Sequence, residues 1–282
     1  MYLCITMNLN DKILQIIRTR NSLLCVGLDS NPDRIPSHIM KKDDPIFLFN
    51  KRIIDATVDF VSAYKPNLAF YEALGREGWD ILKRTIDYIP DGILKIGDAK
   101  RGDIGSTAQK YADALFDLGF DVVTVNPYLG FDSIEPFITD EKRGAFILCL
   151  TSNPSSKDFQ YLCSDGRTLY HHVAEKAVKW NKNKNCGLVV GATHADELKK
   201  VRSIAPDLPI LIPGVGAQGG DLRTSVLAGT DKNGEMAIIN SSRGIIYASS
   251  GEDFDDAARR EAERIYNSIN NARDEKLRGQ SN

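Results

Sequence analysis

Residues 93–103 read ILKIGDAKRGD, an apolar run that ends in a dense group of charged residues. A short apolar run bounded by polar residues is typical of a buried strand in a parallel sheet. Seven further runs of this kind occur along the chain, and stretches with helical periodicity separate them. The eight runs cover residues 23–29, 61–67, 93–100, 122–127, 145–152, 187–193, 209–216 and 236–243. Repeated βα units of this number predict an α/β protein with a (β/α)8 fold, the TIM barrel.

The stretches between the runs predict the outer helices of the barrel. They cover residues 46–60, 69–88, 104–119, 131–139, 166–182, 195–205, 220–228 and 252–272. The polar stretch 153–166 after the fifth run predicts a long loop that acts as a lid. No linker rich in Pro, Gly or Ser divides the chain, so we expect a single domain over residues 1–282. A flexible N-terminal extension over residues 1–7 and a polar, frayed C-terminal tail over residues 271–282 are expected at its ends.

The overall composition excludes several classes of protein. Of the 282 residues, 42% are hydrophobic, which is enough to bury a large core and excludes a wholly disordered chain. A net charge of -2 provides no basic surface for nucleic acid or for an anionic membrane, so we expect a small-molecule partner. Five cysteines without CxxC spacing argue against a zinc site and against a disulfide framework. The first six residues are too short for a signal peptide and no apolar run reaches the length of a membrane span, so we expect a cytoplasmic protein.

Charged residues gather at the ends of the predicted strands, where a (β/α)8 barrel builds its active site. Asp98 and Lys100 are two residues apart on the third strand, so they are expected to point to the same side of it. An isolated pair of this kind would most simply be a structural ion pair at the barrel rim. Lys65 at the end of the second strand and Asp103 after the third extend the pair to an alternating set of charges. Because burying such a set costs desolvation energy, its presence favours a catalytic role.

Two segments rich in glycine and serine follow the last two predicted strands. Residues 214–220 read GVGAQGG, and residues 240–244 read NSSRG and include Arg243. Loops after the seventh and eighth strands form the usual phosphate site of this fold, because glycines let backbone amides approach an anion and arginine adds a guanidinium. Each segment alone is a weak signal, since glycine-rich turns are often only tight connections. Together they predict a phosphorylated ligand.

The most specific motif of the chain is DAKRGDIGST over residues 98–107. Further motifs are GLDSNP at the first predicted strand, AYKPN at the second, LTSNPSS at the fifth and PGVGAQGGD at the seventh. With these motifs the chain resembles the orotidine 5'-monophosphate decarboxylases, and more closely their second-type bacterial branch, over nearly its whole length. The resemblance implies a carboxy-lyase that converts orotidine 5'-monophosphate (OMP) to uridine 5'-monophosphate (UMP), the last step of de novo UMP biosynthesis. It also implies that no metal and no organic cofactor takes part.

The resemblance further implies roles for individual residues. Lys100 is similar to the residue that protonates C6 of the pyrimidine, and Asp98 and Lys65 are similar to its partners in a charged network. Lys65 and Asp29 are also placed to contact the ribose hydroxyls. Ser152 resembles the residue that contacts the pyrimidine ring.

Other residues are implied to act on the phosphate or in a second subunit. Gln218 and Arg243 resemble the contacts to the phosphate and its closing loop. Asp103, with Ile104 and Thr107, resembles a group that is supplied to the active site of the other subunit of a homodimer. The loop after the fifth strand and the insertion before the eighth differ in length from compact members of the family.

Two other interpretations remain open at this point. Sugar-phosphate lyases of the same superfamily, such as 3-keto-gulonate 6-phosphate decarboxylases and hexulose 6-phosphate synthases, share the Asp-x-Lys-x-x-Asp signature but use Mg2+. Lys65 stands where those enzymes are expected to carry an acidic ligand, which argues against this interpretation. A non-catalytic barrel that binds a phosphorylated metabolite is the second alternative. It does not account for two lysines and two aspartates at one end of the site.

Overall fold

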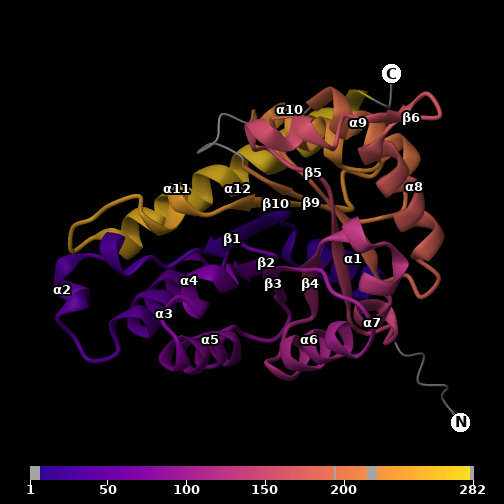
Figure 1. Ribbon diagram of the computed structural model, residues 1–282. Coiled ribbons are helices and arrows are strands. Elements are labelled where there is room, and N and C mark those ends of the chain that lie inside the picture. Colours follow the sequence, from indigo (N-terminus) through magenta and orange to yellow (C-terminus); the bar gives the residue numbers. More distant parts are fainter. Residues whose placement is uncertain (1–6, 194, 215–220, 280–282) are drawn as a thin grey trace, which may run out of the picture.

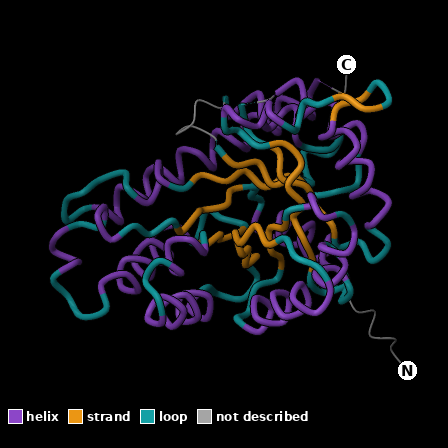
Figure 2. Tube along the Cα trace, in the orientation of Figure 1, coloured by secondary structure: helices purple, strands orange, loops and turns teal. Residues whose placement is uncertain are grey.

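The eight apolar runs form the strands of a closed parallel barrel in the computed structural model of the chain, which describes residues 7–193, 195–214 and 221–279. The strands are β1 (Leu24–Leu28), β2 (Ala63–Pro66), β3 (Leu94–Arg101), β4 (Val122–Val125), β5 (Gly144–Leu150), β8 (Cys186–Val190), β9 (Ile210–Pro213) and β10 (Ala237–Ser241). Around the barrel the order is β1, β10, β9, β8, β5, β4, β3, β2, so the first strand pairs with the last. Figure 2 shows the strands at the centre and the helices around them. The (β/α)8 fold expected from the sequence is confirmed.

Helices surround the barrel and connect one strand to the next (Figure 1). They are α1 (Leu9–Arg20), α2 (Ser37–Met40), α3 (Pro45–Thr57), α4 (Leu68–Glu72), α5 (Arg76–Tyr88), α6 (Gly105–Asp117), α7 (Glu135–Ile138), α8 (Leu169–Trp180), α9 (Ala195–Ile204), α10 (Leu222–Gly229), α11 (Arg243–Ile246) and α12 (Phe254–Gly279). The connections also contain short 3-10 helices at Pro32–Arg34, Pro127–Leu129, Phe131–Ser133 and Pro154–Asp158. Helix α12 packs on α3, α10, α11 and β1, so it covers the barrel where the first strand pairs with the last.

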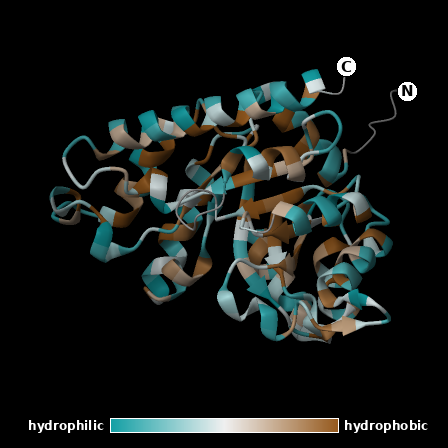
Figure 3. Cartoon of the chain, turned by 90° about the horizontal axis from the view of Figure 1, so that it is seen from above, coloured by the Kyte–Doolittle hydropathy of each residue, from teal (hydrophilic) through white to brown (hydrophobic). Residues whose placement is uncertain are grey.

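The barrel strands are apolar because both of their faces are covered, by the barrel interior and by the helices. Every residue of β1, β8 and β10 is buried, although β10 ends in the polar Asn240 and Ser241. Phe146 of β5 and Phe49 of α3 are among the largest fully buried side chains. Figure 3 shows hydrophobic residues inside the molecule and hydrophilic residues on the outer faces of the helices. This packing fixes the strand ends on which the polar residues of the site stand.

The structure differs from the sequence-based expectation in the N-terminal half. Helix α1 lies in a stretch for which we predict no helix, and its amide at Leu9 and the side chain of Asn10 donate to the carbonyls of Glu141 and Cys186. It therefore closes the end of the barrel at which the strands begin. The single helix predicted over residues 69–88 is divided into α4 and α5. Gly75 separates them with a φ of 64°, a conformation that favours glycine and ends a helix.

The prediction of a frayed C-terminal tail is wrong for residues 271–279, because these residues continue α12. The guanidinium of Arg273 donates to the carbonyl of Gly234 at 2.8 Å, and the ammonium of Lys276 donates to the carbonyls of Leu227 and Thr230 at 2.8 and 2.7 Å. These bonds attach the last turns of the helix to the barrel. Residues 280–282 of the expected tail, and residues 1–6 of the expected N-terminal extension, lie outside the described residues.

The stretch predicted as a long lid loop contains local structure of its own. It begins with the 3-10 helix Pro154–Asp158 and continues into a two-stranded hairpin of β6 (Cys163–Ser164) and β7 (Arg167–Thr168). Gln160 fastens the segment to the barrel, because its side chain accepts from the Thr151 amide at 2.8 Å. Its movement as a lid remains a prediction.

None of the helices in the described part of the chain is both long and apolar enough to cross a membrane.

Candidate active site

A cavity of about 280 Å³ opens at the end of the barrel where the strands finish. Of the predicted site residues, six line this cavity: Asp29, Lys65, Asp98, Lys100, Ser152 and Arg243. Its other lining residues are Asn67, Thr124, Leu148, Thr151, Asn153, Val189, Leu211, Pro213, Gly214, Asn240 and Ser242. The cavity therefore draws on strand ends from the whole circumference of the barrel.

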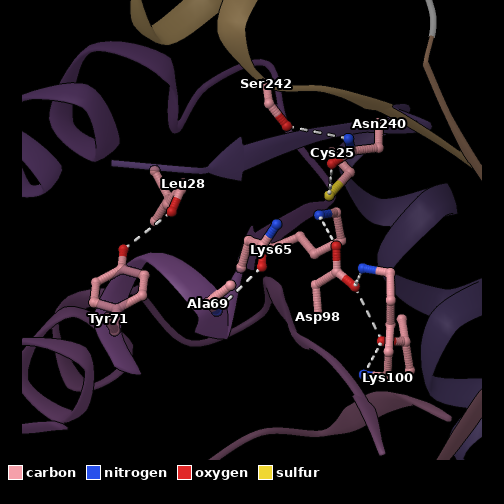
Figure 4. A network of polar contacts seen from close by, with 11 residues as sticks. Cys25, Leu28, Lys65, Ala69, Tyr71, Asp98, Lys100, Asn240 and Ser242 are labelled. Atoms are coloured by element: carbon pink, nitrogen blue, oxygen red, sulfur yellow. Dashed lines mark hydrogen bonds and ion pairs between the residues drawn. The ribbon is translucent and has the colours of Figure 1, made fainter. Parts of the chain in front are cut away.

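Asp98 is the centre of the charged part of the cavity. Its two carboxylate oxygens accept hydrogen bonds from different lysines. Oδ2 accepts from Lys65 Nζ at 2.8 Å, and Oδ1 accepts from Lys100 Nζ at 2.5 Å. Figure 4 shows the two lysines approaching the carboxylate from different sides. The side chain of Lys65 is only 4% exposed, whereas that of Lys100 is 50% exposed. Both lysines line the cavity, but Lys65 is the more firmly held charge and Lys100 is the more exposed one.

The ionisation of this cluster follows from its burial and its charges. Burial alone favours the neutral forms, raising the pKa of Asp98 and lowering that of Lys65. The lysine charges outweigh burial at Asp98 and hold its pKa well below the usual range. The charges of Asp98 and Asp29 likewise hold the pKa of Lys65 above its usual range. At neutral pH the pair is therefore a buried carboxylate and a buried ammonium.

The backbone around Lys100 departs from a regular strand. The register between β3 and β4 shifts between Gly97 and Arg101, and Lys100 has a φ of 50°, which is uncommon for a residue other than glycine. Thr124 of β4 supports this conformation, because its Oγ1 accepts from the Lys100 amide at 2.9 Å and donates to Asp98 Oδ1 at 3.0 Å. The sequence-based prediction that Asp98 and Lys100 meet assumes regular alternation along a strand. The two side chains do meet, but the backbone at Lys100 is not that of a regular strand.

Asp29 and Ser152 present buried oxygens to the cavity that have no partner within the described structure. These atoms are Asp29 Oδ1 and Ser152 Oγ. A buried oxygen without a hydrogen bond is costly, so both are suited to a ligand. Gly191 after β8 makes room for Ser152, since a Cβ at this glycine would lie 2.0 Å from Ser152 Oγ.

The end of β10 contributes Asn240, Ser242 and Arg243. Asn240 Nδ2 donates to Ser242 Oγ at 3.3 Å, and its Oδ1 accepts from the thiol of Cys25 at 3.4 Å, next to Lys65 (Figure 4). Burial raises the pKa of Cys25 to about 12, so the thiol stays protonated and serves as a donor. Arg243 is exposed at the cavity mouth, and the described residues offer it no ion pair. Its guanidinium is suited to an anionic ligand.

Three of the predicted residues do not line the cavity, and a fourth cannot be placed. Gln218 lies outside the described residues. Asp103, Ile104 and Thr107 stand on the segment from the end of β3 into α6 and do not line the cavity of their own chain. Asp103 Oδ1 accepts from the Ile104 amide at 2.8 Å, and the side chain of Ile104 is 54% exposed.

Two cavity residues, Thr124 and Asn240, have no role in the sequence-based prediction, although Asn240 lies in the NSSRG segment. Thr124 is the one polar residue in the VVTV run of β4, and Asn240 interrupts the apolar AII run of β10. A polar residue inside a buried strand is a signal that could have identified both. Which ligands or side chains they meet depends on the pairing of strands, and this is not visible in the sequence.

Within the described residues, no three His, Cys, Asp or Glu side chains lie close enough together to hold a metal ion. The acidic side chains of the cavity, Asp29 and Asp98, are accompanied by Lys65 and Lys100.

The chain is similar to known proteins over nearly its whole length. A sequence profile of the orotidine 5'-phosphate decarboxylase / HUMPS family matches residues 22–255. A curated orotidine 5'-phosphate decarboxylase of Dehalococcoides mccartyi is 53% identical over 268 residues, which cover 93% of this chain and 97% of that relative. Another from Herpetosiphon aurantiacus is 52% identical over 248 residues, which cover 87% of this chain and 91% of that relative. The solved structure of a Leishmania donovani OMP decarboxylase superposes with a TM-score of 0.82 at 38% identity, covering 95% of this chain and 99% of that chain.

Proposed function

This chain belongs to the orotidine 5'-phosphate decarboxylase / HUMPS family, and we propose that it decarboxylates OMP to UMP by electrostatic stabilisation of a carbanion at C6. The mechanism rests on the Lys65–Asp98–Lys100 cluster. In it, Asp98 forms ion pairs with the buried ammonium of Lys65 and with the exposed ammonium of Lys100. The curated relatives named above are orotidine 5'-phosphate decarboxylases, and they cover nearly the whole of this chain.

The chemistry requires a fixed positive charge. When the bond between C6 and the carboxylate breaks, its electron pair stays on C6, and no neighbouring carbonyl can delocalise it. The ammonium of Lys100 is placed to stabilise this charge and then to transfer a proton to C6, which gives UMP and leaves a neutral amine. Asp98 orients the two lysines, because each of its carboxylate oxygens accepts from one of them.

The remaining cavity residues are assigned to parts of the nucleotide. Asp29 and Lys65 bind the ribose hydroxyls, a role that suits the unpartnered oxygen of Asp29. Ser152 contacts the pyrimidine, and Arg243 binds the phosphate, with Gln218 as a further contact. Phosphate binding far from C6 supplies energy that orders the site for the transition state.

Asp103, Ile104 and Thr107 are assigned to the active site of a second subunit in a homodimer. Their position outside the cavity of their own chain supports this assignment.

The direct test replaces Lys100 and follows the absorbance change of OMP on decarboxylation. We expect Lys100→Ala to abolish turnover while its circular dichroism spectrum and thermal unfolding midpoint stay close to those of the wild type. Lys110→Ala is the matched control, because Lys110 is an exposed lysine on α6 whose ion pair with Asp113 lies on the surface. Near-normal turnover in Lys100→Ala would refute the mechanism. Turnover that survives EDTA separates this function from that of a Mg2+-dependent sugar-phosphate lyase.

A further inference from the structure

One tyrosine joins the two parts of the cavity wall that carry Asp29 and Arg243. Tyr247 follows α11, the short helix that begins at Arg243, and its amide donates to the Arg243 carbonyl at 3.3 Å. Its hydroxyl donates to the Asp29 carbonyl at 2.9 Å and accepts from the Asn31 amide at 2.6 Å. The side chain therefore bridges the segment after β10 and the segment after β1.

This bridge lies where the sheet no longer holds the two segments together. The register between β1 and β10 ends with Val26 opposite Ser241. Past that pair, the Tyr247 hydroxyl supplies two hydrogen bonds between the segments. These two hydrogen bonds therefore contribute directly to the relative position of the residues that follow the two strands.

The ring of Tyr247 is itself held in place. It stacks on Phe49 with the ring centroids 5.8 Å apart and the planes inclined by 18°, and the guanidinium carbon of Arg34 lies 4.1 Å from its centroid. Burial raises the pKa of Tyr247, so the hydroxyl keeps its proton at neutral pH and remains a donor to Asp29. The ring of Tyr247 is thus held by packing, and its hydroxyl is held by hydrogen bonds.

The backbone on either side of Asp29 is also fixed. Tyr71 donates its hydroxyl to the Leu28 carbonyl at 3.1 Å (Figure 4), and Ser30 donates its hydroxyl to Asn50 Oδ1 at 2.5 Å. Within this frame the Asp29 carboxylate lines the cavity with Oδ1 buried and without a partner in the described residues. These hydrogen bonds hold the backbone around Asp29 in one position, and in that position Asp29 Oδ1 has no hydrogen bond to the described residues.

We infer that Tyr247 is a positioning residue that fixes the carboxylate of Asp29 relative to the guanidinium of Arg243, so that the cavity favours ligands carrying a ribose and a 5'-phosphate in one molecule. This inference rests on the proposed function, which assigns Asp29 to the ribose and Arg243 to the phosphate. Loss of the hydroxyl removes the tie between Asp29 and the Arg243 segment, so the Asp29 carbonyl can shift relative to Arg243 although its neighbours Leu28 and Ser30 keep their own hydrogen bonds, and the phosphate contact stays intact. The effect falls on nucleotide binding more than on the chemical step, because Tyr247 does not line the cavity.

The test compares Tyr247→Phe with the wild type by isothermal titration calorimetry, using UMP and inorganic phosphate as separate ligands. Phenylalanine keeps the ring stacking and removes only the two hydrogen bonds. We expect the Kd for UMP to rise about tenfold and the Kd for phosphate to stay unchanged. The matched control is Tyr64→Phe, which removes another buried hydroxyl, bonded to Thr57 and to the Ile54 carbonyl in α3, without touching either segment. It should bind both ligands like the wild type.

Turnover of OMP gives an independent readout. In Tyr247→Phe, kcat/KM should fall about tenfold, mainly through KM, with a thermal unfolding midpoint close to that of Tyr64→Phe. An unchanged Kd for UMP in Tyr247→Phe, or an equal loss of affinity for UMP and for phosphate, overturns the inference. A wild-type protein that releases no CO2 from OMP counts instead against the proposed function, since UMP binding can be measured without turnover.

Discussion

At the scale of single residues, Asp98 determines the state of the active site, because one carboxylate holds two lysines of different character. Lys65 is buried and cannot exchange its partner for water, whereas Lys100 is half exposed and can turn toward a substrate. Removing Asp98 leaves an ammonium in the barrel without its nearest counter-charge. Such an uncompensated buried charge is expensive.

Asp98→Asn is expected to make stability depend on pH in a range where the wild type is insensitive. In the wild type the contribution of Asp98 is present above its ordinary pKa of 3.8 and is lost as the pH falls through its lower folded value. The contribution of Lys65 is present below its ordinary pKa of 10.5 and is lost as the pH rises through its higher folded value. Neither change falls between about pH 5 and pH 9.

Burial is the largest single effect on Lys65, so in Asp98→Asn, where the attraction of Asp98 is gone, we expect the pKa of Lys65 to fall below its ordinary value. The unfolded chain then binds more protons than the folded one, so the free energy of unfolding should rise with pH up to about pH 10. At pH 7 we expect a loss of about 3 kcal/mol relative to the wild type. Urea unfolding at several pH values measures both effects, with Asp87→Asn as a control that breaks an exposed ion pair with Lys83. A flat profile in Asp98→Asn contradicts this account.

The charged residues of the cavity could be predicted from the sequence, because charges at strand ends have few structural explanations. Asp29, Lys65, Asp98 and Lys100 are all found there. Tyr247 could not be predicted, since its importance comes from hydrogen bonds to a segment 218 positions away. Such long-range partners are set by barrel closure and leave no local pattern.

At the scale of structural elements, Arg202 of α9 holds together the end of the barrel opposite the cavity. Its guanidinium is buried and donates to the carbonyls of Gly229, Ala205, Pro206, Leu208 and Met236. These carbonyls lie at the end of α10 and just before β9 and β10. Burial lowers the pKa of Arg202 to about 10, which leaves it charged at neutral pH. One side chain thus supplies hydrogen bonds to backbone carbonyls in the turns that precede β9 and β10.

Arg202→Met is expected to lower the free energy of unfolding by about 3 kcal/mol, because five carbonyls lose a buried charged donor. Turnover per folded molecule should not change, since the site lies at the other end of the strands. Chemical denaturation and kcat/KM at low temperature check the two statements. Arg223→Met, which breaks the exposed pair with Glu275, should leave the unfolding midpoint near that of the wild type. Equal unfolding midpoints for the two variants would show that Arg202 is not an anchor.

Strands were easier to predict than helices. Except for β2 and β3, which carry charged residues, the strand runs are nearly continuous in apolar residues because both of their faces are buried. Each predicted run lies within a few positions of the observed strand. Helix α1 is absent from the sequence-based prediction because its sequence, LNDKILQIIRTR, precedes the first strand and lies outside the βα repeat. Helix α12 exceeds its expected end because its last turns are polar and are held by hydrogen bonds of Arg273 and Lys276, not by an apolar stripe.

At the scale of the whole molecule, the position of Asp103 outside its own cavity makes activity a property of the assembly under the proposed function. Mixed dimers of Lys100→Ala and Asp103→Ala chains contain one site that has both wild-type residues. We expect such mixtures to regain a measurable fraction of wild-type turnover, although each variant alone is impaired. Tagged copurification verifies the mixed dimers before the assay. A failure to complement in verified mixed dimers argues against the shared site.

The pairing of β1 with β10 has a consequence for how the protein is made. The Cys25 thiol contacts a partner 215 positions later in the chain, so β1 can pair with β2 early in synthesis and with β10 only after all the strands between them have been made. Until then the nascent chain carries an open sheet edge, which invites pairing with other chains. The cavity wall that carries Asp29 and Arg243 is therefore complete only after β10 has paired with β1 and closed the barrel.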